Sequence, residues 1–136
     1  MTARFLLDTN IVIFAIRNRT PLLRERLTGH FGRMAVSTIT VAELQYGVER
    51  SSDPARNRRA TEEFLALLEV QPFSAAAAEH SGEIRAVLAA SGRSIGAYDV
   101  LIAGHARAGG LTVVTNNLRE FERVPGLLVE DWSEPG

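Results

Sequence analysis

The chain of 136 residues contains no cysteine. This absence excludes a disulfide framework, a zinc finger, an iron–sulfur cluster and a thiol nucleophile, and it is typical of a protein of the reducing cytoplasm. No apolar run approaches the roughly 20 residues that a membrane span needs. The first residues lead directly into an apolar segment that is typical of a core strand, so we expect neither a signal peptide nor a membrane anchor.

Lysine is also absent, and all 15 of the Lys and Arg positions are arginine. Residues 1–60 carry a net charge of +5 and residues 61–136 a net charge of −6. A GC-rich genome explains the missing lysine but not the crowding of arginine in the first half. Because arginine binds phosphate through two parallel hydrogen bonds, Arg17, Arg19, Arg24 and Arg26 are candidates for phosphate contacts, with a solvated surface as the alternative.

The glycine-rich phosphate-binding motifs G-x-x-x-x-G-K and G-x-G-x-x-G do not occur, so a nucleotide-binding loop has no support. Gly109 and Gly110 are typical of a helix stop. The three histidines, His30, His80 and His105, do not cluster in the sequence. His105 falls within an alanine-rich helical pattern, which favours a place in the core over a catalytic role.

Apolar segments of strand length alternate with segments of helical period along the whole chain. We expect strands at residues 4–7, 34–37, 69–72, 111–115 and 127–130, and helices at residues 10–17, 21–31, 40–50, 53–68, 74–90, 96–108 and 118–123. This alternation predicts one α/β domain, a three-layer α/β/α sandwich with a mostly parallel central sheet. The domain spans residues 1–132, and residues 133–136 form a tail.

Aspartate is scarce, and each of its four positions can be considered separately. Asp53 precedes a proline and a helical run, which is typical of a helix cap, and Asp131 lies in the polar C-terminal segment. Asp8 follows the first expected strand, where α/β proteins bind ligands. Asp99 shares an apolar helix face with Ile102, near the start of that helix, which favours a functional role over a capping role.

Glu43 completes a Thr40-x-x-Glu43 capping pattern, and the same position at a helix start suits a metal ligand. If Asp8, Glu43 and Asp99 converge within ~5 Å, each pair repels by about 3 kcal/mol at an effective dielectric of 20. Three such pairs approach the stability of a whole domain, so convergence requires a cation or a shared proton. Oxygen ligands without cysteine select Mg²⁺ or Mn²⁺, and such a site suits phosphodiester hydrolysis.

Three segments resemble the PIN-domain toxins of VapBC toxin–antitoxin modules: FLLDTNIVIFAIRN, STITVAELQYGVERS and IGAYDVLIAGHARAGGLTVVTNNLREFERVPGLLVEDW. The resemblance covers Phe5 to Trp132. It implies an endoribonuclease that cleaves structured RNA, tRNA or rRNA, and so inhibits translation. It also implies that Asp8, Glu43 and Asp99 bind Mg²⁺ or Mn²⁺.

Many members of this family carry aspartate at a fourth position, where this chain has Asn117, and Glu120 is the nearest acid. Either residue could complete the metal site, and Thr9, Thr115 and Asn116 could support it. The resemblance further implies a homodimer and a small VapB-type antitoxin that inserts a C-terminal segment near the active site. Contact with DNA is expected only through that antitoxin, and no contact with a membrane is expected.

Two other functions remain open at this stage. Asn117 in place of an acid is compatible with a degenerate PIN domain that binds RNA or protein without catalysis. A phosphotransfer domain with Asp8 as nucleophile requires a second aspartate near Asp8 and a lysine, and the sequence supplies neither. Tyr98 could stack on a base or pack in the core. A metal-dependent RNA cleavage assay separates the three functions.

Overall fold

The computed structural model describes residues 2–17 and 20–135. Its strands are β1 (Phe5–Leu7), β2 (Met34–Ser37), β3 (Glu69–Gln71), β4 (Thr112–Val114) and β5 (Val129–Glu130). They form one sheet in the order β3-β2-β1-β4-β5, and every neighbouring pair is parallel. The strand order reverses between β1 and β4, and this switch point is where open α/β sheets bind their ligands.

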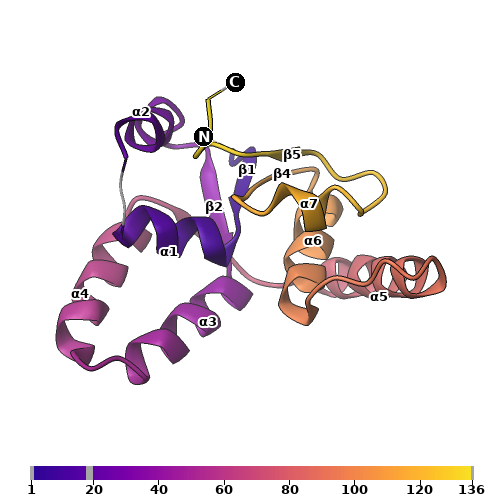
Figure 1. Cartoon of the computed structure of the whole chain (residues 1–136), viewed down its shortest axis with the longest axis horizontal. Helices are drawn as coiled ribbons and strands as arrows, with labels where there is room; N and C mark the ends of the chain where they lie inside the picture. The colour runs from indigo at the N-terminus through magenta and orange to yellow at the C-terminus, as the bar shows by residue number, and fades with distance from the viewer. Residues whose placement is uncertain (1, 18–19, 136) are drawn as a thin grey trace.

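Helices cover both faces of the sheet (Figure 1). One face carries α1 (Thr9–Arg17), α2 (Pro21–Gly29), α3 (Thr38–Glu49) and α4 (Pro54–Leu65), and the other carries α5 (Ala75–Ala90), α6 (Ala97–Gly109) and α7 (Leu118–Phe121). The predicted three-layer α/β/α architecture is therefore confirmed. Within the described ranges, no helix is long and apolar enough to cross a membrane.

The two cores follow from the period-two alternation of strand side chains. Leu6 and Val113 are fully buried among α5, α6 and α7, while their neighbours Leu7 and Val114 are fully buried on the opposite face, among α1 to α4. Because β1 and β4 are covered on both sides, β1 is apolar throughout and β4 is apolar after Thr112, as is usual for central parallel strands.

Most helix starts and stops follow the local signals. Thr20, Asp53 and Ser74 each accept a hydrogen bond from a backbone N–H in the first turn of their helices. Gly110 ends α6 with a φ of 67°, a left-handed conformation that glycine adopts without a steric cost.

Several helix boundaries differ from prediction, two of them at the ends of α2 and α4. Helix α2 ends at Gly29 instead of residue 31, and α4 ends at Leu65 instead of residue 68. After α4 the Leu67 and Leu68 amides donate to carbonyls three residues back, at 3.1 and 3.0 Å. Such bonds tighten the last turn and end the α-helical pattern.

The predicted capping role of Thr40 is wrong. Helix α3 begins two residues earlier, and Ser37 is its N-cap, with its side chain accepting from the Ile39 amide at 3.1 Å. Thr40 is fully buried inside the first turn. Glu43 is therefore not the partner in a capping box, and its side chain is available for the site.

Candidate active site

Asp8 is held at the switch point by groups from both central strands. It directly follows β1, its amide donates to the Val114 carbonyl at 3.0 Å, and its side chain is 1% exposed. Oδ1 accepts from the Ile11 amide at 2.8 Å, so Asp8 also caps α1, and Oδ2 accepts from the Thr115 hydroxyl at 2.6 Å. The backbone and two hydrogen bonds thus restrict this carboxylate to one orientation.

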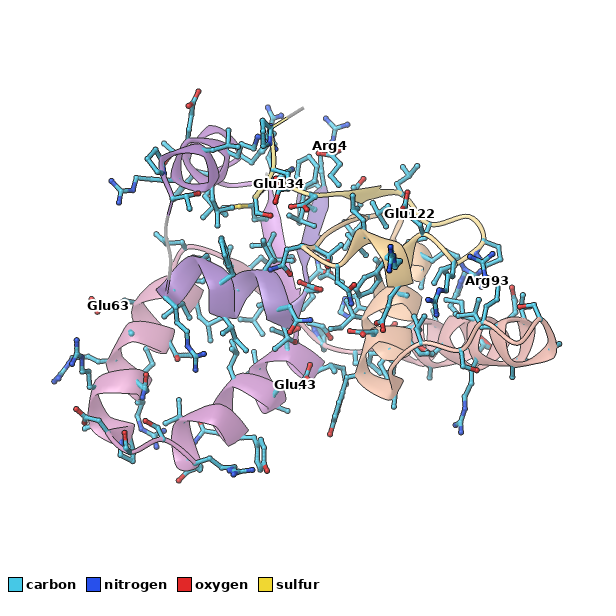
Figure 2. The ribbon with its side chains drawn as sticks, viewed as in Figure 1. Arg4, Glu43, Glu63, Arg93, Glu122 and Glu134 are labelled. Carbon is cyan, nitrogen blue, oxygen red and sulfur yellow. The ribbon has the colours of Figure 1, made fainter. Side chains whose placement is uncertain are left out.

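Glu43 reaches the site from the first half of α3, and it is labelled in Figure 2. The hydroxyl of Thr9 donates to Glu43 Oε1 at 2.5 Å and lies 3.1 Å from the hydroxyl of Thr40. Thr9 is the residue after Asp8, so this contact places Glu43 beside the end of β1. Thr40 is a residue of the site that the sequence analysis assigned to helix capping alone.

Asp99 lies in the first turn of α6 and is half-buried. The pKa of Asp99 is raised to about 7, chiefly by burial and next by the neighbouring Glu120 carboxyl. The negative charges of Asp8 and Glu43 act in the same direction. The structure thus places Asp99 within electrostatic reach of the other two predicted ligands.

Burial also raises the pKa of Asp8 to about 6, although the hydrogen bonds from Thr115 and Ile11 lower it. The charges of Glu43 and Asp131 contribute a smaller increase. Within the described residues, the ion pairs Arg58–Glu49 and Arg107–Glu83 lie elsewhere, and no arginine or histidine pairs with an acid of this cluster. The acidic cluster, defined as Asp8, Glu43, Asp99 and Glu120, therefore carries uncompensated negative charge.

The residues that follow β4 contribute to the site to different extents. Thr115 is fully buried, and its hydroxyl accepts from the Asn117 amide at 2.8 Å while donating to Asp8. Asn116 is exposed, and the Asn117 side chain makes no capping bond to α7. Of the two predicted fourth residues, Glu120 is the one placed against Asp99.

The arginines that were predicted to contact phosphate have different surroundings in the structure. Arg17 is exposed at the end of α1, and Arg19 lies outside the described residues. Arg24 lines a groove between α2 and α4. Arg26 donates to the carbonyls of Asp131 and Glu134 at 3.0 and 2.9 Å, so it fastens the C-terminal segment to α2.

The side chains of Tyr98 and the histidines are also placed. Tyr98 is 55% exposed, which contradicts the core-packing alternative. His30 stacks on Trp132, His80 accepts a hydrogen bond from Arg107, and the buried His105 contacts Ser37 Oγ and Gln71 Oε1 at 2.9 and 3.1 Å. None of these contacts involves the acidic cluster, and the prediction that His105 belongs to the core is confirmed.

Over the part of the chain that the structure describes, no three Asp, Glu or His side chains already form a group arranged to hold a metal ion. The carboxylates instead turn to local donors, Asp8 to Thr115 and Glu43 to Thr9.

The comparisons with known proteins agree with this geometry. The family model described as "PIN domain" matches residues 5–127. The "tRNA(fMet)-specific endonuclease VapC" of Shigella flexneri is 52% identical over 96% of this chain and 98% of its own. "Ribonuclease VapC2" of Haemophilus influenzae is 47% identical over 95% and 98% of the two chains. In the solved structure of DNA-bound VapBC from Salmonella typhimurium, the matched chain is 52% identical, with a TM-score of 0.93 over 96% of this chain and 98% of that chain.

Proposed function

The chain belongs to the PIN-domain family and, within it, to the VapC ribonucleases, and on this premise we propose that it is a metal-dependent endoribonuclease toxin that cleaves tRNA. The observation that carries the proposal is the acidic cluster at the switch point, which has no cationic partner among the described residues. The 52% identity to endonucleases named for tRNA(fMet) supports tRNA as the substrate. Because tRNA is a cytoplasmic substrate, we propose that the protein acts in the cytoplasm.

The residues present fit a hard divalent cation. The cluster offers carboxylate oxygens from Asp8, Glu43 and Asp99, with Glu120 as the fourth acid, and none of the described histidine contacts involves them. This donor set selects Mg²⁺ or Mn²⁺ over zinc. When bound, the ion would lower the pKa of the attacking water and offset negative charge on the phosphodiester oxygens.

Other residues of the chain hold the acids of the cluster in place. Thr115 and the first turn of α1 hold Asp8, and Thr9 holds Glu43, so two of the acids are oriented before substrate arrives. Preorganised carboxylates lose little conformational entropy when the complex forms. Glu120 lies against Asp99 on the other side of the switch point and keeps that carboxyl in the cluster.

We further propose that a VapB-type antitoxin binds this chain, and that DNA is contacted through the antitoxin. Solved VapBC complexes match nearly the whole chain, and two of them are DNA-bound. A mainly apolar groove of about 220 Å³ between α2 and α4 is a candidate binding site for the antitoxin, since Phe31 and Leu67 on its walls are 57% and 48% exposed. Exposed apolar side chains gathered around a groove are typical of a protein interface.

The test is cleavage of purified tRNA by antitoxin-free protein, with Mg²⁺ or Mn²⁺ and with EDTA. We expect defined cleavage products that require the metal and disappear in Asp99→Asn and Glu120→Gln. The matched control is Glu122→Gln, on the exposed side of the same turn (Figure 2), which should retain wild-type activity. Binding of tRNA without metal-dependent cleavage would instead support the degenerate, non-catalytic PIN domain.

A further inference from the structure

A second concave site adjoins the acidic cluster. A cleft of about 460 Å³ lies between α1, α3 and α4, and Glu43 is one of its lining residues. Because Glu43 also belongs to the acidic cluster, the cleft and the cluster share a wall. When one part of an RNA strand is bound at the cluster, an adjacent nucleotide of the same strand can therefore lie in the cleft.

The lining of this cleft combines aliphatic and polar side chains. Ile13 and Ile16 of α1 and Leu44 of α3 supply aliphatic surface, while Arg17 and Asn57 contribute polar groups at the edge. This combination suits an unstacked nucleotide, whose base takes the apolar surface while its edge and phosphate take the polar groups.

Arg50 is held at the rim by a neighbour one helical turn earlier. Its Nη1 donates to the Tyr46 hydroxyl at 2.9 Å, and its guanidinium carbon lies 5.6 Å from the centre of the Tyr46 ring. The adjacent acid Glu49 is paired with Arg58 at 3.3 Å. The charge of Arg50 is thus positioned without being neutralised by a carboxylate in the described part of the chain, and it suits a phosphate.

We propose that this cleft is a nucleotide subsite, which binds a base of the RNA strand next to the scissile bond and its phosphate through Arg17 and Arg50. The inference rests on the proposed ribonuclease function and deepens it. RNA is favoured over an antitoxin segment because the cleft adjoins the acidic cluster and Glu43 is the only acid among its described lining residues. An antitoxin side chain in the cleft is the competing occupant that the experiment tests.

Gly47 offers a direct test, since it lines the cleft and a Cβ built on it meets no atom within 4 Å. Gly47→Leu should fill part of the cleft without disturbing the core, and Gly47→Ala reports the effect of the lost glycine alone. Gly82→Leu is the matched control, because Gly82 lies in α5 and its Cβ also meets nothing within 4 Å.

The measurements are kcat/KM for tRNA cleavage, the Kd for fluorescent tRNA in EDTA, and the melting temperature. We expect Gly47→Leu to lower kcat/KM and weaken binding at least tenfold, Gly47→Ala to have a smaller effect in the same direction, and Gly82→Leu to stay within about twofold of wild type. Arg50→Gln should reduce the slope of log affinity against log salt by roughly 0.7 to 0.9, the loss of one phosphate contact. Arg59→Gln, an exposed arginine of α4, is its control and should leave the slope unchanged.

The results that would overturn the subsite differ from the result that would overturn the ribonuclease function. If wild-type protein cleaves tRNA and Gly47→Leu cleaves and binds it equally well, the subsite is wrong and the ribonuclease function stands. If Gly47→Leu cleaves normally but escapes inhibition by the antitoxin, the cleft belongs to the antitoxin and the subsite is again wrong. If wild-type protein does not cleave RNA with either metal, the proposed function fails and the subsite fails with it.

Discussion

The hydroxyl of Thr115 donates to Asp8 Oδ2 at 2.6 Å and joins two residues that lie 107 positions apart in the sequence. Thr115 follows β4 and Asp8 follows β1, so the bond links the two strands at the point where the sheet order reverses. Both side chains are buried, which shields the bond from water. Such a bond stabilises the ionised form of Asp8 and fixes the direction of its carboxylate.

Thr115→Val should therefore weaken both the fold and the site. The variant leaves a buried carboxylate and the Asn117 amide without the hydroxyl, so we expect a loss of about 1–3 kcal/mol in the free energy of unfolding. The acidic limb of the pH–rate profile for RNA cleavage should move to higher pH, because the lost bond had lowered the pKa of Asp8. Thr112→Val, at the start of β4, should leave the profile unchanged, and an equal change in both variants would contradict this role of Thr115.

Asp99→Asn should give opposite results for a metal ligand and for a plain helix-end acid. The substitution keeps the shape and removes one charge of the acidic cluster, so the metal-free variant should be more stable than wild type by ~1–3 kcal/mol. It should lose RNA cleavage and the rise in melting temperature that Mg²⁺ or Mn²⁺ provides by mass action. If Asp99 only stabilises its own helix, the variant should instead lose a few tenths of a kcal/mol and remain active. Thermal melts in EDTA and in Mn²⁺, beside one cleavage assay, distinguish the two.

The stability of the metal-free protein should fall as pH rises through about 6 to 7. The pKa values of Asp8 and Asp99 are raised from 3.8 to about 6 and about 7, so between pH 4 and 7 the folded state binds more protons than the unfolded state. Burial lowers the pKa of His105, which acts in the opposite direction below pH 6.5. Urea unfolding of wild type and Asp99→Asn in EDTA at pH 5 and pH 8 removes the His105 contribution by difference. A stability difference between the two proteins that is the same at both pH values would refute the raised pKa of Asp99.

Arg17, the last residue of α1, and Arg19 should contribute to the salt dependence of RNA binding. Replacing Arg17 and Arg19 by glutamine should flatten the slope of log affinity against log salt, since each phosphate contact releases counterions. The double change Arg56→Gln and Arg59→Gln, on exposed positions of α4, is the control of equal charge. An unchanged slope in the first variant would reassign Arg17 and Arg19 to antitoxin binding or to a solvated surface.

The protein is expected to be a homodimer, and light scattering of the antitoxin-free protein at micromolar concentration tests this. The apolar residues at and just after the end of α4 are divided between core and surface. Phe64 is 3% exposed and belongs to the core, whereas Leu67 is 48% exposed on the groove between α2 and α4. A dimer that persists in Leu67→Gln would place the interface elsewhere, and a monomer mass for the wild type would contradict the prediction.

Much of the fold could be predicted because its signals are local. The periods of apolar residues located every strand and helix, and caps such as Thr20 and Asp53 marked where helices begin. A cap needs only a side chain and an amide two or three positions away. The failure at Thr40 has the same origin, since a second hydroxyl at Ser37 met this local condition three residues earlier.

The composition of the site could also be anticipated, but its contacts could not. Position at the ends of strands singled out Asp8 and the segment after β4, and position on a buried face singled out Asp99. Nothing local indicated that Thr9 would hold Glu43, or that Glu120 and not Asn117 would face Asp99. These contacts join residues on different helices and strands, so they depend on strand order and helix packing, which many distant apolar side chains determine together. The sequence by itself thus determined which residue types form the site. Which of these side chains contact one another was decided only when β1 and β4 became neighbours in the folded sheet.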